Sequence, residues 1–156
     1  MRSWDELARG IECPFDAPRP QSNEHWDFIS KLSVSSMYLS SNQTYRGYSL
    51  LVFDPRHVIR LDQLTTAEWS GFAADLRVAN AALVEVVRPD HMNVELLGNV
   101  ISHLHWHLVP RFKNDVRWGG PIWTTSQADM KQTRMPAVER AELVTRLQVA
   151  VASYSL

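Results

Sequence analysis

Alternating polar and apolar side chains at residues 103–109 constrain the fold more than any other feature of the sequence. The segment reads His-Leu-His-Trp-His-Leu-Val. Successive side chains of a β-strand point to opposite faces, so His103, His105 and His107 would share one face and the apolar residues the other. Three imidazoles on one face need polar partners or water, because desolvating them for packing alone is costly. We therefore expect a strand with one chemical face and one core face.

The remaining patterns predict an α+β domain with an antiparallel sheet of about five strands. Thr65 and Glu68 have the spacing of a capping box, and apolar residues then recur at helical spacing until Pro89, which predicts one long helix over 66–87. This helix should cover the core face of the histidine strand. Shorter signals predict a helix at 4–9, a hairpin within 26–39, strands at 48–53, 92–97 and 102–109, and a terminal helix after Pro136. Leu97-Gly98-Asn99 allows a tight turn between the last two strands.

The length and composition indicate a single folded domain over residues 1–156. Within it we expect an N-terminal extension (1–25), a core that holds the histidines (26–112) and a C-terminal segment with a helix (113–156). A hydrophobic content of 45% argues against disorder, and a net charge of -1 argues against binding to a nucleic acid polymer. With no long apolar segment, the protein should not enter a membrane, and we expect it in the cytoplasm.

Two chemistries compete for the histidines. A metal site is one, because imidazole is a common zinc ligand. However, at about 3.3 Å per residue His103 and His107 start roughly 13 Å apart, which is too far for both to bind one ion. A neighbouring pair would need help from His25, His57 or His91, none of which has a convincing spacing. The second possibility is phosphoryl chemistry, in which one neutral imidazole attacks phosphorus and its neighbours stabilise charge. This possibility favours the central His105 as the nucleophile.

Several motifs resemble those of the histidine triad (HIT) family. Residues 103–109 match its His-φ-His-φ-His-φ-φ signature, where φ is apolar. The stretch Asn-Val-Glu-Leu-Leu-Gly-Asn at 93–99 is similar to the family's strand and turn before the triad, and Pro110-Arg111 to the Pro-Arg that often follows it. Upstream, 46–58 is similar to the family's glycine-containing strand and its Pro-Arg-His loop. The Arg-Gly-Tyr strand and Leu-His-Trp-His triad most resemble a bacterial subgroup described as dinucleoside polyphosphate hydrolases.

The resemblance implies a mechanism and a substrate class. His105 would be transiently nucleotidylated, His107 would contact the α-phosphate, and His103 would support the nucleophile, partly through its backbone carbonyl. The substrate would be an adenine nucleotide or a dinucleoside polyphosphate, with no tightly bound cofactor and with Mg²⁺ entering only on substrate phosphates. The chain would act as a homodimer with sheets joined edge to edge, an arrangement that exposed Trp118 and Trp123 would suit. The alternative is a nucleotide-binding regulatory module with negligible turnover.

Five further residues would bind the nucleotide by the same resemblance. Asn93 and Asn99 match amides that contact phosphate or the leaving group, although polar residues also suit a turn and a strand edge. Asn42 is the candidate for the ribose contact, with its neighbours at 41 and 43 as alternatives. Tyr48 stands where many members have a fourth histidine, and Arg111 could hold a distal phosphate or be a solvated surface charge.

The N-terminal extension departs from the family's zinc-binding members. Cys13-Pro14-Phe15-Asp16 lacks their second cysteine, and Cys13 is the chain's sole cysteine, so we expect no disulfide and no metal there. Cys13 would then be an ordinary small apolar residue. His57 matches a frequent family histidine, for which we expect a structural role.

Overall fold

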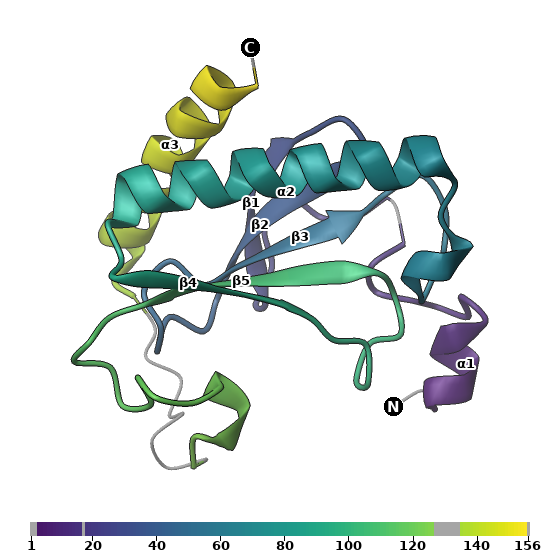
Figure 1. The fold of residues 1–156 in the computed structure, drawn as a ribbon, viewed down its shortest axis with the longest axis horizontal. Coiled ribbons are helices and arrows are strands. Elements are labelled where there is room, and N and C mark those ends of the chain that lie inside the picture. The colour runs from purple at the N-terminus through teal and green to yellow at the C-terminus, as the bar shows by residue number, and fades with distance from the viewer. Residues whose placement is uncertain (1–2, 17, 127–134, 156) are drawn as a thin grey trace.

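The centre of the fold is an antiparallel sheet of five strands (Figure 1). The computed structural model describes residues 3–16, 18–126 and 135–155. In sheet order the strands are β1 (Trp26–Lys31), β2 (Ser35–Ser40), β3 (Ser49–Phe53), β5 (His105–Arg111) and β4 (His91–Leu96). Every neighbouring pair is antiparallel, so β5 lies between β3 and β4. The predicted α+β class is confirmed.

Two long helices pack on one face of this sheet, and α2 lies across it in Figure 1. The predicted capping box starts α2, since the hydroxyl of Thr65 accepts from the backbone N–H of Glu68 and the carboxylate of Glu68 accepts from that of Thr65. In the described ranges of the chain, no helix combines the length and apolar character needed to cross a membrane. The helices are α1 (Trp4–Ala8), α2 (Thr66–Val87) and α3 (Ala137–Tyr154), with short 3-10 turns at Leu61–Gln63 and Ile122–Thr124.

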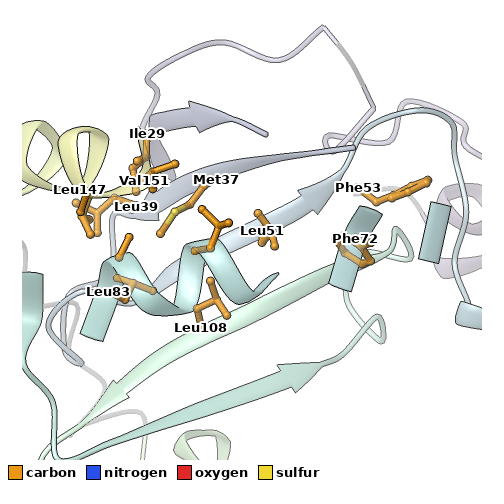
Figure 2. Close-up of a cluster of buried hydrophobic side chains, with 14 of the residues drawn as sticks. Ile29, Met37, Leu39, Leu51, Phe53, Phe72, Leu83, Leu108, Leu147 and Val151 are labelled. Atoms are coloured by element: carbon orange, nitrogen blue, oxygen red, sulfur yellow. The ribbon is translucent and has the colours of Figure 1, made fainter. Parts of the chain in front are cut away.

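The main core lies between the sheet and these helices, as Figure 2 shows. On β3, Leu51 and Phe53 point into this core, whereas Leu50 and Val52 belong to a second apolar cluster. The strand is therefore buried on both faces. The second cluster also contains Phe15, so the N-terminal segment covers part of the sheet face opposite the helices. The sheet side chains shown in the main core include Ile29, Met37, Leu39, Leu51, Phe53 and Leu108.

A buried carboxylate fixes the β1–β2 hairpin to α2. Asp75, on α2, is 4% exposed and accepts hydrogen bonds from the backbone N–H groups of Ser33 and Val34 at 3.1 and 2.9 Å. The hydroxyls of Ser33 and Ser35 donate to the same carboxylate at 2.7 and 2.6 Å. The hairpin turn therefore has its donors satisfied by a helix 40 residues further along the chain.

The connection from β4 to β5 differs from the tight turn that the sequence predicted. It runs from Leu97 to Leu104, because the backbone of Leu104 bonds away from β4. The carbonyl of Leu104 accepts from the N–H of Phe53, and its own N–H donates to Val58. The prediction was wrong because these distant partners, rather than the local Gly98, set where the strand begins. The extra residues form one wall of a cavity.

Candidate active site

A cavity of about 340 Å³ lies against the sheet face opposite the helices. His105 and His107 line it, because β5 alternates and puts both imidazoles on this face while Leu104 and Leu108 enter the main core. The phenyl ring of Phe72 on α2 contacts Trp106 on the core side, with centroids 5.8 Å apart. The predicted division holds for His105 and His107, whereas His103 lies before β5, is buried and does not line the cavity. The lining residues are Phe15, Tyr48, Leu50, Leu97, Gly98, Asn99, Val100, Ile101, His105, His107 and Trp123.

The hydrogen bonds of His105 determine which of its nitrogens is free to react. Its Nδ1 lies 2.5 Å from the backbone carbonyl oxygen of His103. A carbonyl only accepts, so Nδ1 carries the hydrogen of the neutral ring and Nε2 keeps its lone pair. His105 is 4% exposed and its Nε2 faces His107 at 3.0 Å. The ring is thus held as a neutral base with its lone pair directed at the second histidine.

His107 is fixed in the complementary tautomer by Tyr48. Because Nε2 of His105 is an acceptor, Nε2 of His107 must carry the hydrogen that joins the two rings. The remaining Nδ1 of His107 accepts from the hydroxyl of Tyr48 at 2.7 Å. Burial raises the pKa of Tyr48 well above its usual value, which keeps this hydroxyl a donor. One chain of hydrogen bonds therefore orders Tyr48, His107 and His105.

Burial also keeps both imidazoles uncharged. It lowers the pKa of His105 to about 4, and it lowers the pKa of His107 to about 3 with a further contribution from His105. For His103 the direction is the same, again chiefly through burial. At neutral pH both rings are therefore unprotonated, which is the form an imidazole needs in order to act as a nucleophile.

Two aromatic residues that the sequence did not single out as site residues complete the walls. The ring of Phe15 meets the edge of His105 at a centroid distance of 4.8 Å. Trp123 meets His107 at 5.0 Å, and its indole N–H donates to Glu95, which pairs with His107 across β4 and β5. The sequence indicated exposed tryptophans after β5, and at 45% exposure Trp123 is one, but nothing local showed that it turns back onto the triad.

The predicted nucleotide-binding amides occupy three different positions. Asn99 lies on the rim of the cavity and is exposed. Asn93 is half-buried on β4 opposite Val109, two residues before Glu95, and is not among the lining residues. Asn42 is also outside the lining, and its side chain accepts from the N–H of Thr44 at 3.1 Å. Of the three amides, the structure brings only Asn99 to the histidines.

Arg111 does not reach the cavity, contrary to its predicted role in holding a phosphate. It is 1% exposed and donates to both carboxylate oxygens of Asp115, at 2.7 and 2.9 Å. Its guanidinium also donates to the carbonyl oxygen of Gly120 at 2.9 Å and to that of Arg117. These bonds use its donors to hold the loop after β5. In this structure Arg111 therefore holds the loop after β5.

A second polar cluster adjoins the triad on the side of the N-terminal segment. The possible ligand atoms of Cys13, Asp16, His57 and His103 all lie within 4.8 Å of one another. We expected no metal here because the second cysteine of the zinc-binding members is missing, and the structure places the carboxylate of Asp16 in that region. In sequence, Cys13 and His103 are separated by 90 residues, so no spacing rule connects them.

Comparison with known proteins decides the family. The profile of the HIT domain matches residues 25–114, which is more than half of the chain. The chain belongs to the HIT domain family. Solved histidine triad proteins share its fold. One from Bradyrhizobium japonicum has a TM-score of 0.75 at 22% identity and covers 82% of this chain and 92% of its own. One from Sinorhizobium meliloti 1021 has a TM-score of 0.73 at 21% identity and covers 81% of this chain and 90% of its own. A third, from Marinobacter aquaeolei VT8, has a TM-score of 0.70 at 22% identity over 83% and 91%. No protein with curated annotation matches.

Membership of the HIT family supports a function in nucleotide binding or hydrolysis in general. The three solved structures are too distant in sequence to carry more than the fold. The geometry adds one specific feature to this general function: an unprotonated Nε2 on His105 lies beside an N–H donor on His107.

Proposed function

We propose that this HIT protein is a nucleotidyl-transferring hydrolase that uses His105 as its nucleophile. The observation that carries the proposal is the carbonyl of His103, which holds Nδ1–H of His105 and leaves Nε2 unprotonated at the cavity. The same bond stabilises the positive charge that the ring acquires once Nε2 is attached to phosphorus. His107 presents an N–H beside the reacting atom, suited to a non-bridging phosphate oxygen.

The reaction takes place in two in-line displacements. In the first, Nε2 of His105 forms a bond to the α-phosphorus while the bond from phosphorus to the leaving group breaks, and the leaving group keeps the electron pair. In the second, a water oxygen attacks the same phosphorus and the phosphorus–nitrogen bond breaks. The water loses a proton to solvent, and a nucleoside monophosphate and free His105 are released.

We further propose an adenine nucleotide as substrate, with dinucleoside polyphosphates as the preferred class and Mg²⁺ only on the substrate's own phosphates. The support is the resemblance of the Arg-Gly-Tyr strand to that subgroup, together with the apolar walls formed by Phe15, Leu50 and Trp123, which suit a planar base or another flat group. Tyr48 contributes by fixing His107, and it also lines the cavity that would hold the substrate.

One observation favours the rival function, a nucleotide-binding regulatory module with negligible turnover. Among the described residues, no Lys or Arg lines the cavity, and Arg111 is committed to the loop after β5. A site without a cation stabilises the charge of a polyphosphate leaving group poorly. If wild-type protein binds nucleotides but turns over none of them, this reading replaces the first.

The test is hydrolysis of diadenosine tetraphosphate and adenosine 5′-phosphoramidate in ¹⁸O-water, with products separated and weighed. Attack at the α-phosphorus places the label in AMP. His105→Asn should lower turnover at least about 10³-fold while leaving the fold and nucleotide binding intact. His25→Asn is the matched control because His25 is exposed, and it should keep the wild-type rate.

A neutral quench followed by mass spectrometry should find the nucleotidyl adduct on His105 in the wild type. An adduct on another histidine, or near-normal turnover by His105→Asn, would contradict the assignment of the nucleophile. Trp123→Ala should raise KM for substrates with two bases, whereas Trp118→Ala should not, since Trp118 is exposed but does not line the cavity.

We also propose that the working unit is a homodimer joined through β4. Within the described residues no strand pairs with the outer side of β4, and the exposed Val94, Leu97 and Val100 lie on or just beyond it. Light scattering at assay concentration should give twice the chain mass. A monomer mass at concentrations where the protein is active would refute this part of the proposal.

A further inference from the structure

Arg19 is a buried arginine of the N-terminal segment, and each nitrogen of its guanidinium donates to a different acceptor. Its side chain is 4% exposed. Nε donates to the hydroxyl of Tyr38 at 2.9 Å, Nη1 donates to the backbone carbonyl oxygen of Phe15, and Nη2 donates to the carboxylate of Asp54. The guanidinium also lies over the ring of Tyr38, 5.3 Å from its centroid. Because the guanidinium is a rigid fork that stays charged, these acceptors fix its position.

Asp54 anchors this arginine to the sheet. It directly follows β3, and its side chain is 6% exposed. Its carboxylate also accepts from the hydroxyl of Ser36 on β2 at 2.7 Å and from the ammonium group of Lys31 on β1. Although burial alone would raise the pKa of Asp54, its hydrogen bonds lower that pKa below the usual value, so the group is ionised at neutral pH. Through one carboxylate, Arg19 is therefore joined to three strands.

Phe15, whose carbonyl accepts from Arg19, is the residue that covers His105. It is 3% exposed, lines the cavity and meets the imidazole of His105 with ring centroids 4.8 Å apart. The ring of Trp26 also contacts it, at a centroid distance of 5.9 Å. Phe15 lies outside β1–β5, so the ladder of the sheet does not set its position. The bond from Arg19 reaches back four residues and joins this segment to the anchored guanidinium.

We propose that Arg19 is a positioning residue that holds the ring of Phe15 over His105. Arg19 does not line the cavity, so it acts through Phe15 rather than by touching a ligand. With the ring in place, His105 is 4% exposed and has a flat apolar wall beside it. If the ring moved away, water would reach His105 and the cavity would lose part of the surface on which a planar base packs. The effect on ligands rests on the nucleotide site proposed above, whereas the covering of His105 does not.

Arg19→Lys separates this role from simple ion pairing. A lysine keeps the positive charge beside Asp54, but its single nitrogen cannot donate in all the directions of the guanidinium, so the carbonyl of Phe15 is released. Diethyl pyrocarbonate acylates accessible, unprotonated imidazoles, and peptide mass mapping then gives the labelling rate of His105 without any turnover. That rate should rise at least about 10-fold, the factor expected for loss of one hydrogen bond from a charged donor. The Kd for AMP should rise about 2- to 10-fold, as for a weakened aromatic contact.

A double-variant cycle with Phe15→Ala shows whether Arg19 acts through Phe15. Phe15→Ala alone should expose His105 at least as much as Arg19→Lys does. In the Phe15→Ala background, Arg19→Lys should change the labelling rate by less than about 2-fold, because no ring remains to be held. Arg140→Lys is the matched control, since Arg140 also donates to a carboxylate from a side chain that is only 19% exposed, and it should label as the wild type does. The exposed His25 should label at the same rate in every variant.

Asp54→Asn tests the same link with less risk to folding, because it keeps an acceptor for Arg19 and removes only the charge. It should raise the labelling rate of His105 by a smaller factor, and it decides the matter if circular dichroism shows that Arg19→Lys is unfolded. Two results would overturn the proposal. One is a wild-type labelling rate of His105 in the folded variants, and the other is fully additive effects in the cycle, since Arg19 would then act by a route other than Phe15. Neither result bears on whether His105 is the nucleophile, and a wild type without turnover leaves the labelling test intact.

Discussion

Replacing Asp75 tests how the sheet that carries His105 is held against its covering helix. The Asp75→Ala substitution removes a carboxylate that accepts four hydrogen bonds from the β1–β2 turn, two of them from backbone N–H groups. The serine hydroxyls can rotate toward other acceptors. The N–H groups of Ser33 and Val34 cannot, because the hairpin fixes their direction. The substitution therefore removes the protein partner of at least two backbone donors.

The cost can be estimated from these two groups. Ser33 is exposed and Val34 is half-buried, so water can reach the freed donors; at about 0.5–1.5 kcal/mol net for each of the two hydrogen bonds, Asp75→Ala should lower the free energy of unfolding by about 1–3 kcal/mol. For a chain of this length about 1 kcal/mol corresponds to 2–4 °C in Tm, which gives a fall of roughly 2–12 °C. Asp75→Asn keeps one carbonyl oxygen and should lose about half as much.

Urea denaturation followed by circular dichroism measures the effect, with Glu142→Gln as the control for loss of a carboxylate on an exposed helical position. The control should stay within about 0.5 kcal/mol of the wild type. If Asp75→Ala unfolds at the same urea concentration as the control, the turn is not held by this carboxylate and the role assigned to it is wrong.

Three further predictions concern the site and its surroundings. Tyr48→Phe removes the donor to His107 and should lower kcat about 2- to 12-fold, the equivalent of one hydrogen bond, and unchanged initial rates would contradict the ordering role of Tyr48. Burial lowers the pKa values of His105 and His107 to about 4 and 3, so their protonated forms are disfavoured. We therefore expect kcat/KM to stay level from pH 8 to pH 6 and to fall only as the pH approaches 4. A profile with a midpoint near pH 6.5 would contradict this. Arg111→Lys loses the paired contact with Asp115 and should lower Tm measurably while KM is unchanged, whereas a raised KM would restore its predicted phosphate role.

The sequence predicted the parts of the fold that depend on local periodicity. Alternation at 103–109 placed His105 and His107 on one face because the strand geometry is regular over a few residues. The capping box at Thr65 was equally predictable, since its partner Glu68 lies three residues away.

What the sequence left open depends on contacts between distant segments. The carboxylate of Asp75 on α2, the indole of Trp123 on His107, and Cys13 beside His103 all join segments that only the tertiary fold brings together. Arg111 shows the same limit for a residue to which the sequence did assign a role. An arginine after a triad strand has the chemistry to hold phosphate, and only the path of the following loop shows that Asp115 takes it instead.

The cavity draws much of its wall from chain that lies outside the strands. Phe15, the loop at 97–101 and Trp123 surround the histidines, yet none of them belongs to β1–β5. The exposed side chains of the 97–101 loop and Trp123 can therefore vary in size and polarity without breaking the hydrogen-bond ladder that positions His105, whereas Phe15 is 3% exposed and belongs to the second apolar cluster. The strand that positions His105 is thus separate from the loop residues that would contact a ligand. A library confined to the loop at 97–101 and Trp123 should consequently yield folded proteins whose ligand preference differs from that of the wild type.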